Sequence, residues 1–119
     1  MAMKEFLLVF RMDILTIEMQ PTRAQMKLYM EQWNHWIESI NADGIVTGGN
    51  HLSKKGKVLL PGNKENAGPY VSNKQSIAGY LTIKTKTERS AIAIAKRCPI
   101  LHGKRTSVEV RCITLVNQK

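Results

Sequence analysis

Three charged side chains and a tyrosine have the chemistry to bind an anionic or aromatic molecule. Glu109 and Arg111 are two positions apart in an alternating segment, so a strand would place both side chains on one face. Arg11 ends a similar segment near the N-terminus and could lie beside them. An arginine binds a carboxylate or phenolate through two parallel N–H groups, and Tyr80 could add a hydroxyl and a ring face. We therefore expect these four residues to contact a small ligand.

The same charges also have a structural interpretation. Glu109 could pair with Arg111 or Arg11 across the interface of two copies and so fix the register of a dimer. Charges among apolar neighbours must be paired or must contact a ligand, and either role satisfies that requirement. The sequence leaves both open.

Three histidines could serve as general bases. His51 follows a pair of glycines at the end of a short strand-like segment, where it could face a cleft, and we take it as a fifth ligand-binding candidate. His35 and His102 are expected to be solvated or packed. Cys98 and Cys112 are expected to be reduced, mostly buried thiols. None of these residues has metal-ligand spacing, so we expect neither a metal nor a cofactor.

Length and composition predict a single domain over residues 1–119. The hydrophobic content of 43% is that of a globular chain, and a chain of this size buries roughly two-thirds of its surface. The longest apolar run, Phe6–Phe10, is far shorter than the ~20 residues of a membrane span. It is also too short for an export signal. We therefore expect a cytoplasmic protein with no membrane partner.

The net charge of +9 is concentrated in the second half of the chain. Residues 1–53 carry four Lys or Arg against six Asp or Glu, whereas residues 54–119 carry fourteen against three. This excess suits an anionic partner, or it is simply a solvated basic face. The basic residues are scattered rather than gathered in one stripe, and the few aromatic residues are needed for the core. Nucleic acid is therefore not the expected partner.

Two amphipathic helices are predicted to position these groups. The first runs from Arg23 to Ala42 and begins with a capping box formed by Thr22 and Gln25. Its apolar residues recur at spacings of three and four and form one stripe: Met26, Met30, Trp33, Ile37 and Ile40. The second helix, Glu88–Arg97, ends before a proline.

Four strands and a small hairpin arm complete the predicted structure. The strands are Glu5–Arg11, Ile45–Thr47, Ile77–Thr85 and Thr106–Leu115. The arm pairs Lys57–Leu60 with the segment around Tyr70 through a turn at Pro61-Gly62-Asn63.

This order predicts an α+β fold of the ferredoxin-like βαββαβ type with the arm as an extra β-hairpin. Both helices would cover one face of the four-stranded sheet. The apolar residues of the other face include Leu7, Val9, Tyr80 and Ile113. A second copy of the chain is the simplest cover for that face, so we expect a homodimer.

Several motifs, in this order, resemble those of the YCII-related family, in the branch named for a DGPF motif. They are Lys4-Glu5-Phe6-Leu7-Leu8 with Arg11 and Asp13, Trp33-x-x-Trp36, Gly48-Gly49, Gly68-Pro69-Tyr70 with Lys74, Gly79-Tyr80, Ala95-Lys96-x-Cys98-Pro99 and Ser107-Val108-Glu109-Val110-Arg111. The resemblance implies a dimeric α/β barrel that binds a small molecule. If the protein is an enzyme, the resemblance points to lyase or proton-transfer chemistry. A non-catalytic accessory or regulatory dimer is the alternative.

The chain departs from the family pattern where that pattern carries carboxylates. Ala67 replaces the aspartate of the DGPF motif, and Ser72 and Gln75 replace two glutamates that commonly follow. Cys112 stands where a proline is usual, and the family's His–Asp pair has no counterpart. These departures argue against a mechanism that uses the loop carboxylates. They leave open whether the protein is an enzyme.

Overall fold

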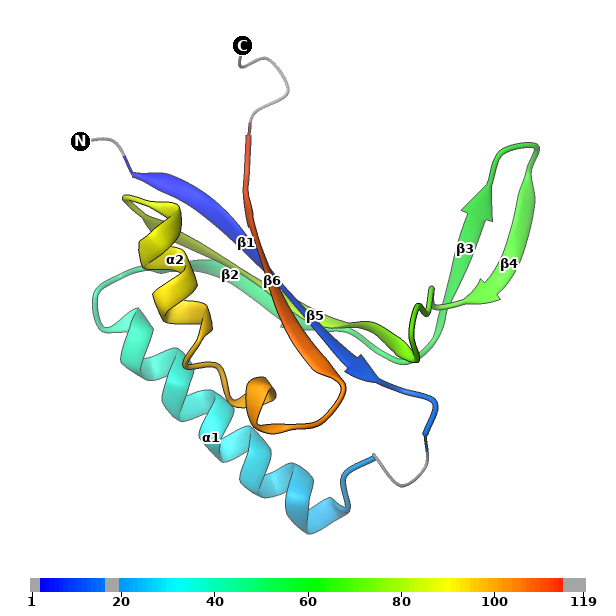
Figure 1. Ribbon diagram of the computed structural model, residues 1–119, viewed down its shortest axis with the longest axis horizontal. Helices are drawn as coiled ribbons and strands as arrows, with labels where there is room; N and C mark the ends of the chain where they lie inside the picture. Colours follow the sequence, from blue (N-terminus) through cyan, green and yellow to red (C-terminus); the bar gives the residue numbers. More distant parts are fainter. Residues whose placement is uncertain (1–2, 17–19, 115–119) are drawn as a thin grey trace.

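The computed structural model describes residues 3–16 and 20–114. These residues form an α+β fold with a four-stranded antiparallel sheet, a separate two-stranded sheet and two α-helices, which confirms the predicted class (Figure 1). In chain order the elements are β1 (Lys4–Asp13), α1 (Arg23–Asn41), β2 (Val46–His51), β3 (Gly56–Leu60), β4 (Lys64–Gly68), β5 (Gln75–Thr85), α2 (Glu88–Ala95), the 3-10 turn η2 (Pro99–His102) and β6 (Thr106–Cys112). The predicted end of the last strand, Leu115, lies outside the described residues.

The four-stranded sheet has the order β2-β5-β1-β6, with antiparallel neighbours throughout. β1 is an interior strand, as expected of a segment with apolar residues on both faces. Phe6, Leu8 and Phe10 alternate on its inner face, and none of them is more than 1% exposed. We call this inner side the helix face, because α1 and α2 both pack against it (Figure 1).

The core lies between the helix face and the two helices. Trp33, Trp36 and Ile40 of α1 are buried against it, and the ring of Phe10 meets Trp33 edge-on with centroids 4.8 Å apart. The start of the helix follows the predicted capping box: Thr22 Oγ1 accepts from the Gln25 amide at 3.1 Å. The predicted stripe is wrong at its first residue, because Met26 is 41% exposed. The first turns of α1 extend past the packed sheet and border a cavity.

The opposite side of the sheet, which we call the open face, carries three cross-strand rows. The rows are Ile77-Arg11-Ser107, Tyr80-Val9-Glu109 and Thr82-Leu7-Arg111. Val9 is only 8% exposed in the single chain, because Tyr80 and Glu109 flank it. Leu7 and Tyr80 are half-buried, and Ile113 is 37% exposed. The long side chains of Tyr80 and Glu109 therefore shield more of the apolar surface of this face than the alternation of residues in the sequence indicates.

The ladder between β1 and β5 contains a bulge at Ala78. Phe10 pairs with Gly79. The next residue of β1, Arg11, pairs with Ile77, which leaves Ala78 without a partner on β1. Simple alternation along β5 would place Ile77 on the helix face, but the extra residue moves it to the open face beside Arg11. There it is 42% exposed.

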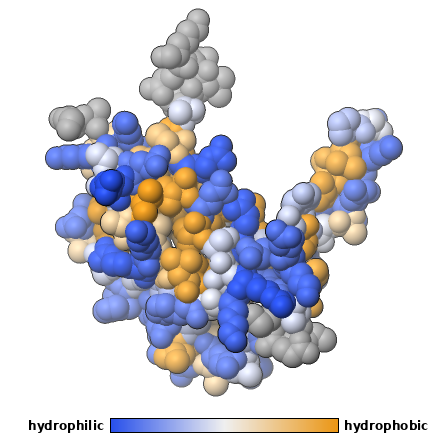
Figure 2. Space-filling model, in the orientation of Figure 1, coloured by the Kyte–Doolittle hydropathy of each residue, from blue (hydrophilic) through white to orange (hydrophobic). Residues whose placement is uncertain are grey.

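The arm formed by β3 and β4 stands away from the four-stranded sheet (Figure 1). Its returning strand is Lys64–Gly68, so the prediction that this strand lies around Tyr70 is wrong. The three-residue turn after Leu60 fixes the register, and β4 ends before the chain reaches Tyr70. Leu59 is 73% exposed and contributes to an apolar area on the arm (Figure 2).

Three further features bear on the predictions. Cys98 is buried as expected, but Cys112 is exposed near the end of edge strand β6, so the expectation of burial is wrong for it. β2 continues through both glycines to His51, further than predicted. Neither helix of the described chain has the length and apolar character that a membrane crossing requires.

Candidate functional site

The five predicted ligand-binding residues lie on two different faces of the sheet. Arg11, Glu109, Arg111 and Tyr80 share the open face, as predicted. His51 does not join them: in the β2–β5 ladder it pairs with Gly79, whereas its neighbour Asn50 pairs with Tyr80. Adjacent strand residues point to opposite faces, so His51 points toward the helices.

On the open face, one carboxylate binds both arginines. Arg11 Nη1 donates to Glu109 Oε1 at 2.7 Å, and Arg111 Nη1 donates to Glu109 Oε2 at 3.2 Å. These hydrogen bonds, the one from Arg11 foremost, hold the pKa of Glu109 below its usual range. Both ion pairs lie within one chain, so they need no second copy. Beside them, the hydroxyl of Tyr80 accepts from Asn50 Nδ2 at 3.3 Å.

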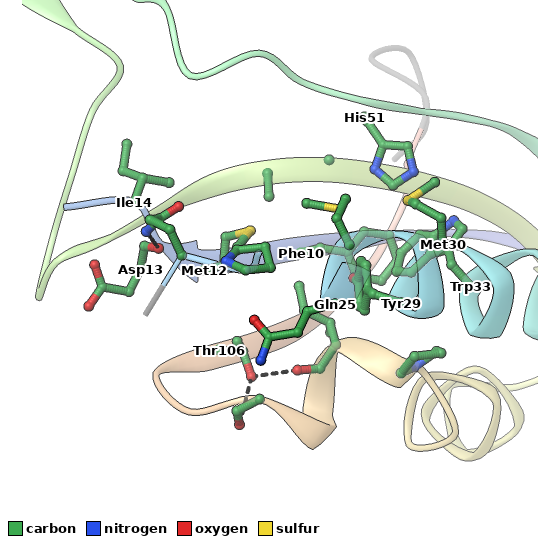
Figure 3. A pocket seen from close by; sticks show the side chains of 18 of the residues that line it. Phe10, Met12, Asp13, Ile14, Gln25, Tyr29, Met30, Trp33, His51 and Thr106 are labelled. Carbon is green, nitrogen blue, oxygen red and sulfur yellow. Dashed lines mark hydrogen bonds between the residues drawn. The ribbon is translucent and has the colours of Figure 1, made fainter. Parts of the chain in front are cut away.

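A cavity lies on the helix face, and we call it the helix-face cavity. It has a volume of about 830 Å³ and is bounded by the first half of α1, the ends of β1 and β2, the start of β5 and the turn before β6 (Figure 3). Aromatic and thioether side chains dominate its walls: Phe10, Met12, Tyr29, Met30 and Trp33. His51 joins them from β2, and its imidazole lies above Met30 and Trp33 (Figure 3).

The position of His51 depends on close packing between β2 and β5. Its ring centroid is 5.2 Å from that of Trp33, with the planes inclined at 50°. The opposite residue is Gly79, where an added Cβ would lie 2.8 Å from the carbonyl oxygen of Asn50. A side chain there would push the strands apart, so the glycine is what allows His51 to sit over the tryptophan.

Asp13 is a buried carboxylate on the cavity wall, but its hydrogen-bonding capacity is already used. Its Oδ1 accepts from the backbone amides of Leu15 at 2.8 Å and Thr16 at 3.0 Å. Its Oδ2 accepts from Arg105 Nη1 at 3.1 Å. The amide of Thr16 is the largest of the contributions that hold the pKa of Asp13 far below its usual range. Asp13 therefore stays ionised and stabilises the loop after β1, and it is not a proton acceptor.

Tyr29 contributes a hydroxyl group to the cavity from α1. Burial raises the pKa of its hydroxyl above the usual range, so the group is protonated at neutral pH and can donate a hydrogen bond. Gln25, one helical turn earlier, also faces the cavity (Figure 3). His102 lies at the cavity wall beside Lys104, whereas His35 is exposed elsewhere on α1.

Sequence reasoning singled out His51 as a ligand-binding candidate, but it did not predict the face of the sheet that His51 occupies, and it missed the neighbours of His51 in this cavity. The helical spacing assigns Tyr29, Met30 and Trp33 to a core face, and nothing in that spacing marks where the sheet beneath them ends. The described residues contain no cluster of three metal-ligating side chains. No protein-family model matches the chain, and no curated protein matches it. Its function is therefore inferred from the geometry of the site.

Proposed function

We propose that the protein binds a small, mainly apolar or aromatic molecule in the helix-face cavity. The observation that carries this proposal is the cavity itself. Its volume of about 830 Å³ falls in the range of roughly 300–1,000 Å³ typical of small-molecule sites. Its walls combine the rings of Phe10, Tyr29 and Trp33 with polar side chains, and aromatic walls that carry polar groups are usual in such sites.

The polar groups define what the bound molecule would meet. A flat ring could pack against Trp33, because aromatic rings prefer offset or edge-on contacts at the distances found within this cluster. The Tyr29 hydroxyl can donate to an oxygen of the ligand. Histidine is the side chain best suited to move a proton near neutral pH. If the protein is an enzyme of the lyase or proton-transfer kind, His51 is the residue that accepts the proton.

The proposal also covers the topology of the fold and the family to which the protein belongs. The order β2-β5-β1-β6, with both helices on one face and the arm between β2 and β5, supports a ferredoxin-like βαββαβ topology. The ordered motifs support membership of the YCII-related family. On that basis the open face is the surface for a second copy, with Ile77 and Ile113 as its exposed apolar residues.

A second candidate function is that of a non-catalytic accessory dimer. The observation in its favour is that Glu109 forms ion pairs with both open-face arginines within one chain. This arrangement fits a structural role for those charges better than the predicted capture of a ligand by Arg111.

The test uses phenylnaphthylamine, a neutral dye whose fluorescence rises in an apolar site. The wild type should bind it, and Met30→Trp should weaken binding at least about 10-fold, because the bulkier indole occupies space in which the rings of the dye would lie. Leu59→Trp is the matched control: it adds the same side chain on the arm, far from the cavity wall. Failure of the wild type to bind the dye, or equal binding by Met30→Trp, would contradict the proposal.

A further inference from the structure

A second cavity lies on the open face at the base of the arm. It has a volume of about 580 Å³, and we call it the arm-base cavity. Two cations, Arg11 and Lys55, line it together with the hydroxyls of Ser53 and Ser72 and the amide of Gln75. Among the described residues that line it, none carries a carboxylate. Leu52, Pro69 and Ile77 add apolar surface, so this cavity combines two cations with an apolar wall.

The two cavities adjoin where β2 ends and β5 begins. Leu52, Ser53, Ser76 and Ile77 line both of them. The bulge at Ala78 creates this shared wall, because it sends Ile77 to the open face while Ser76 stays buried. The amide of Leu52 donates to the Ala78 carbonyl at 2.8 Å and holds the wall together. Both Leu52 and Ile77 are more than 40% exposed, so their side chains have room to move.

We infer that the two cavities are the halves of one site for an amphipathic ligand. The ring system of the ligand occupies the helix-face cavity. A single oxyanion of the ligand, such as a carboxylate, sulfonate or phosphate, extends past the shared wall into the arm-base cavity and lies against Lys55 and Arg11. This inference rests on the proposed function, since it takes the helix-face cavity to be the ring-binding half.

Charge at the arm base favours an anion even though one arginine is engaged. Glu109 binds Arg11 from the β6 side at 2.7 Å and cancels much of its charge. Lys55 then supplies the net positive charge of the cavity. The Arg11 guanidinium has five N–H donors, and its bond to Glu109 uses one nitrogen. The hydroxyl of Ser72 adds a neutral donor, whereas that of Ser53 already donates to the Lys55 carbonyl at 3.2 Å.

The test compares two dyes that differ mainly in charge: neutral phenylnaphthylamine and anionic anilinonaphthalene sulfonate. The wild type should bind the anionic dye more tightly. Lys55→Gln should weaken the anionic dye about 10-fold, as expected for loss of a charged hydrogen bond, and leave the neutral dye unchanged. The matched control is Lys57→Gln, which removes an exposed lysine of β3 that lines neither cavity. It should leave both affinities unchanged.

The outcomes separate this inference from the proposed function. If the wild type does not bind the neutral dye, the proposed function fails, and the two-part site fails with it. If the neutral dye binds but Lys55→Gln leaves the anionic dye unaffected, or Lys57→Gln weakens it equally, the inference fails and the proposed function stands. If Lys55→Gln weakens the binding of both dyes equally, Lys55 does not interact specifically with the anionic group, and the inference is again contradicted.

Discussion

The guanidinium of Arg11 donates to the carboxylate of Glu109 over 2.7 Å, from β1 to its neighbour β6. The contact joins an interior strand to an edge strand on the open face. Arg11 also lines the arm-base cavity, and Glu109 lies one cross-strand row away from Arg11. The same ion pair therefore bears both on stability and on how much positive charge the cavity presents.

The first prediction concerns the pH dependence of this pair. The pKa of Glu109 is lower in the folded chain than in the unfolded chain, so the carboxylate stabilises the fold above the unfolded-state pKa of about 4.3. The contribution is lost as the pH falls below that value. Glu109→Gln should lower the urea midpoint at neutral pH, and the gap from wild type should narrow in acid. Glu65→Gln, which changes an exposed carboxylate of the arm, is the control and should leave the urea midpoint at neutral pH unchanged.

The second prediction concerns the loop after β1. Asp13→Asn removes the charge that binds Arg105 and weakens the acceptor for the amides of Leu15 and Thr16. We expect a lower thermal midpoint and faster amide exchange in this loop. The pKa of Asp13 is lowered by folding, so its stabilising effect is present at neutral pH and is lost in strong acid. Asp43→Asn, at an exposed helix end, is the control; an equal loss of stability there would refute the assignment.

The third prediction compares two glycines with positive φ. Gly49→Ala would place a Cβ 2.7 Å from the carbonyl oxygen of Tyr80, and it should cost roughly 3 kcal/mol in the free energy of unfolding. Gly44→Ala meets nothing within 4 Å, so it carries only the backbone penalty of about 1 kcal/mol. Urea unfolding of both variants measures the difference. Equal costs would mean that β2 and β5 are less closely packed than described.

The fourth prediction concerns the two thiols. Burial raises the pKa of Cys98 to about 12, so this thiol is un-ionised and inaccessible in the folded chain at pH near 8. Cys112 is exposed. Iodoacetamide should modify Cys112 alone in the native protein and both thiols in urea, as read by mass spectrometry. Modification of Cys98 in native Cys112→Ser would show that the core opens on the timescale of labelling.

The fifth prediction concerns the proposed homodimer. The wild type should sediment as a dimer at micromolar concentration, and Ile113→Glu should dissociate it by placing a charge on the open face. Leu101→Glu alters a comparably exposed leucine in η2, on the helix side, and should leave the dimer intact. If the wild type sediments as a monomer, the proposed homodimer is wrong, whereas the proposal of a ligand in the helix-face cavity is unaffected.

Local signals in the sequence were sufficient for most of the fold. The capping box at Thr22 predicted the start of α1, and the alternating residues of Glu5–Arg11 predicted a strand; both predictions are confirmed. They succeed because hydrogen-bonding caps and side-chain alternation act over a few residues. The proximity of Arg11 to Glu109 also followed from strand faces alone.

The candidate site was harder to predict because its shape depends on register. The bulge at Ala78 changes the face of Ile77, and no residue type in that segment signals it. The sequence puts His51 at a strand end that could face a cleft, but only its pairing with Gly79 shows that it lies on the opposite face from the arginines. Register is set by partners far away in the chain, and a single sequence does not display them.

The arm begins and ends at the same place, because Gly56 and Gly68 pair with each other at its base. Everything between them, including the turn at Gly62, forms a self-contained sheet. The hairpin can therefore grow, shrink or be exchanged without moving the strands that carry His51 and Arg11.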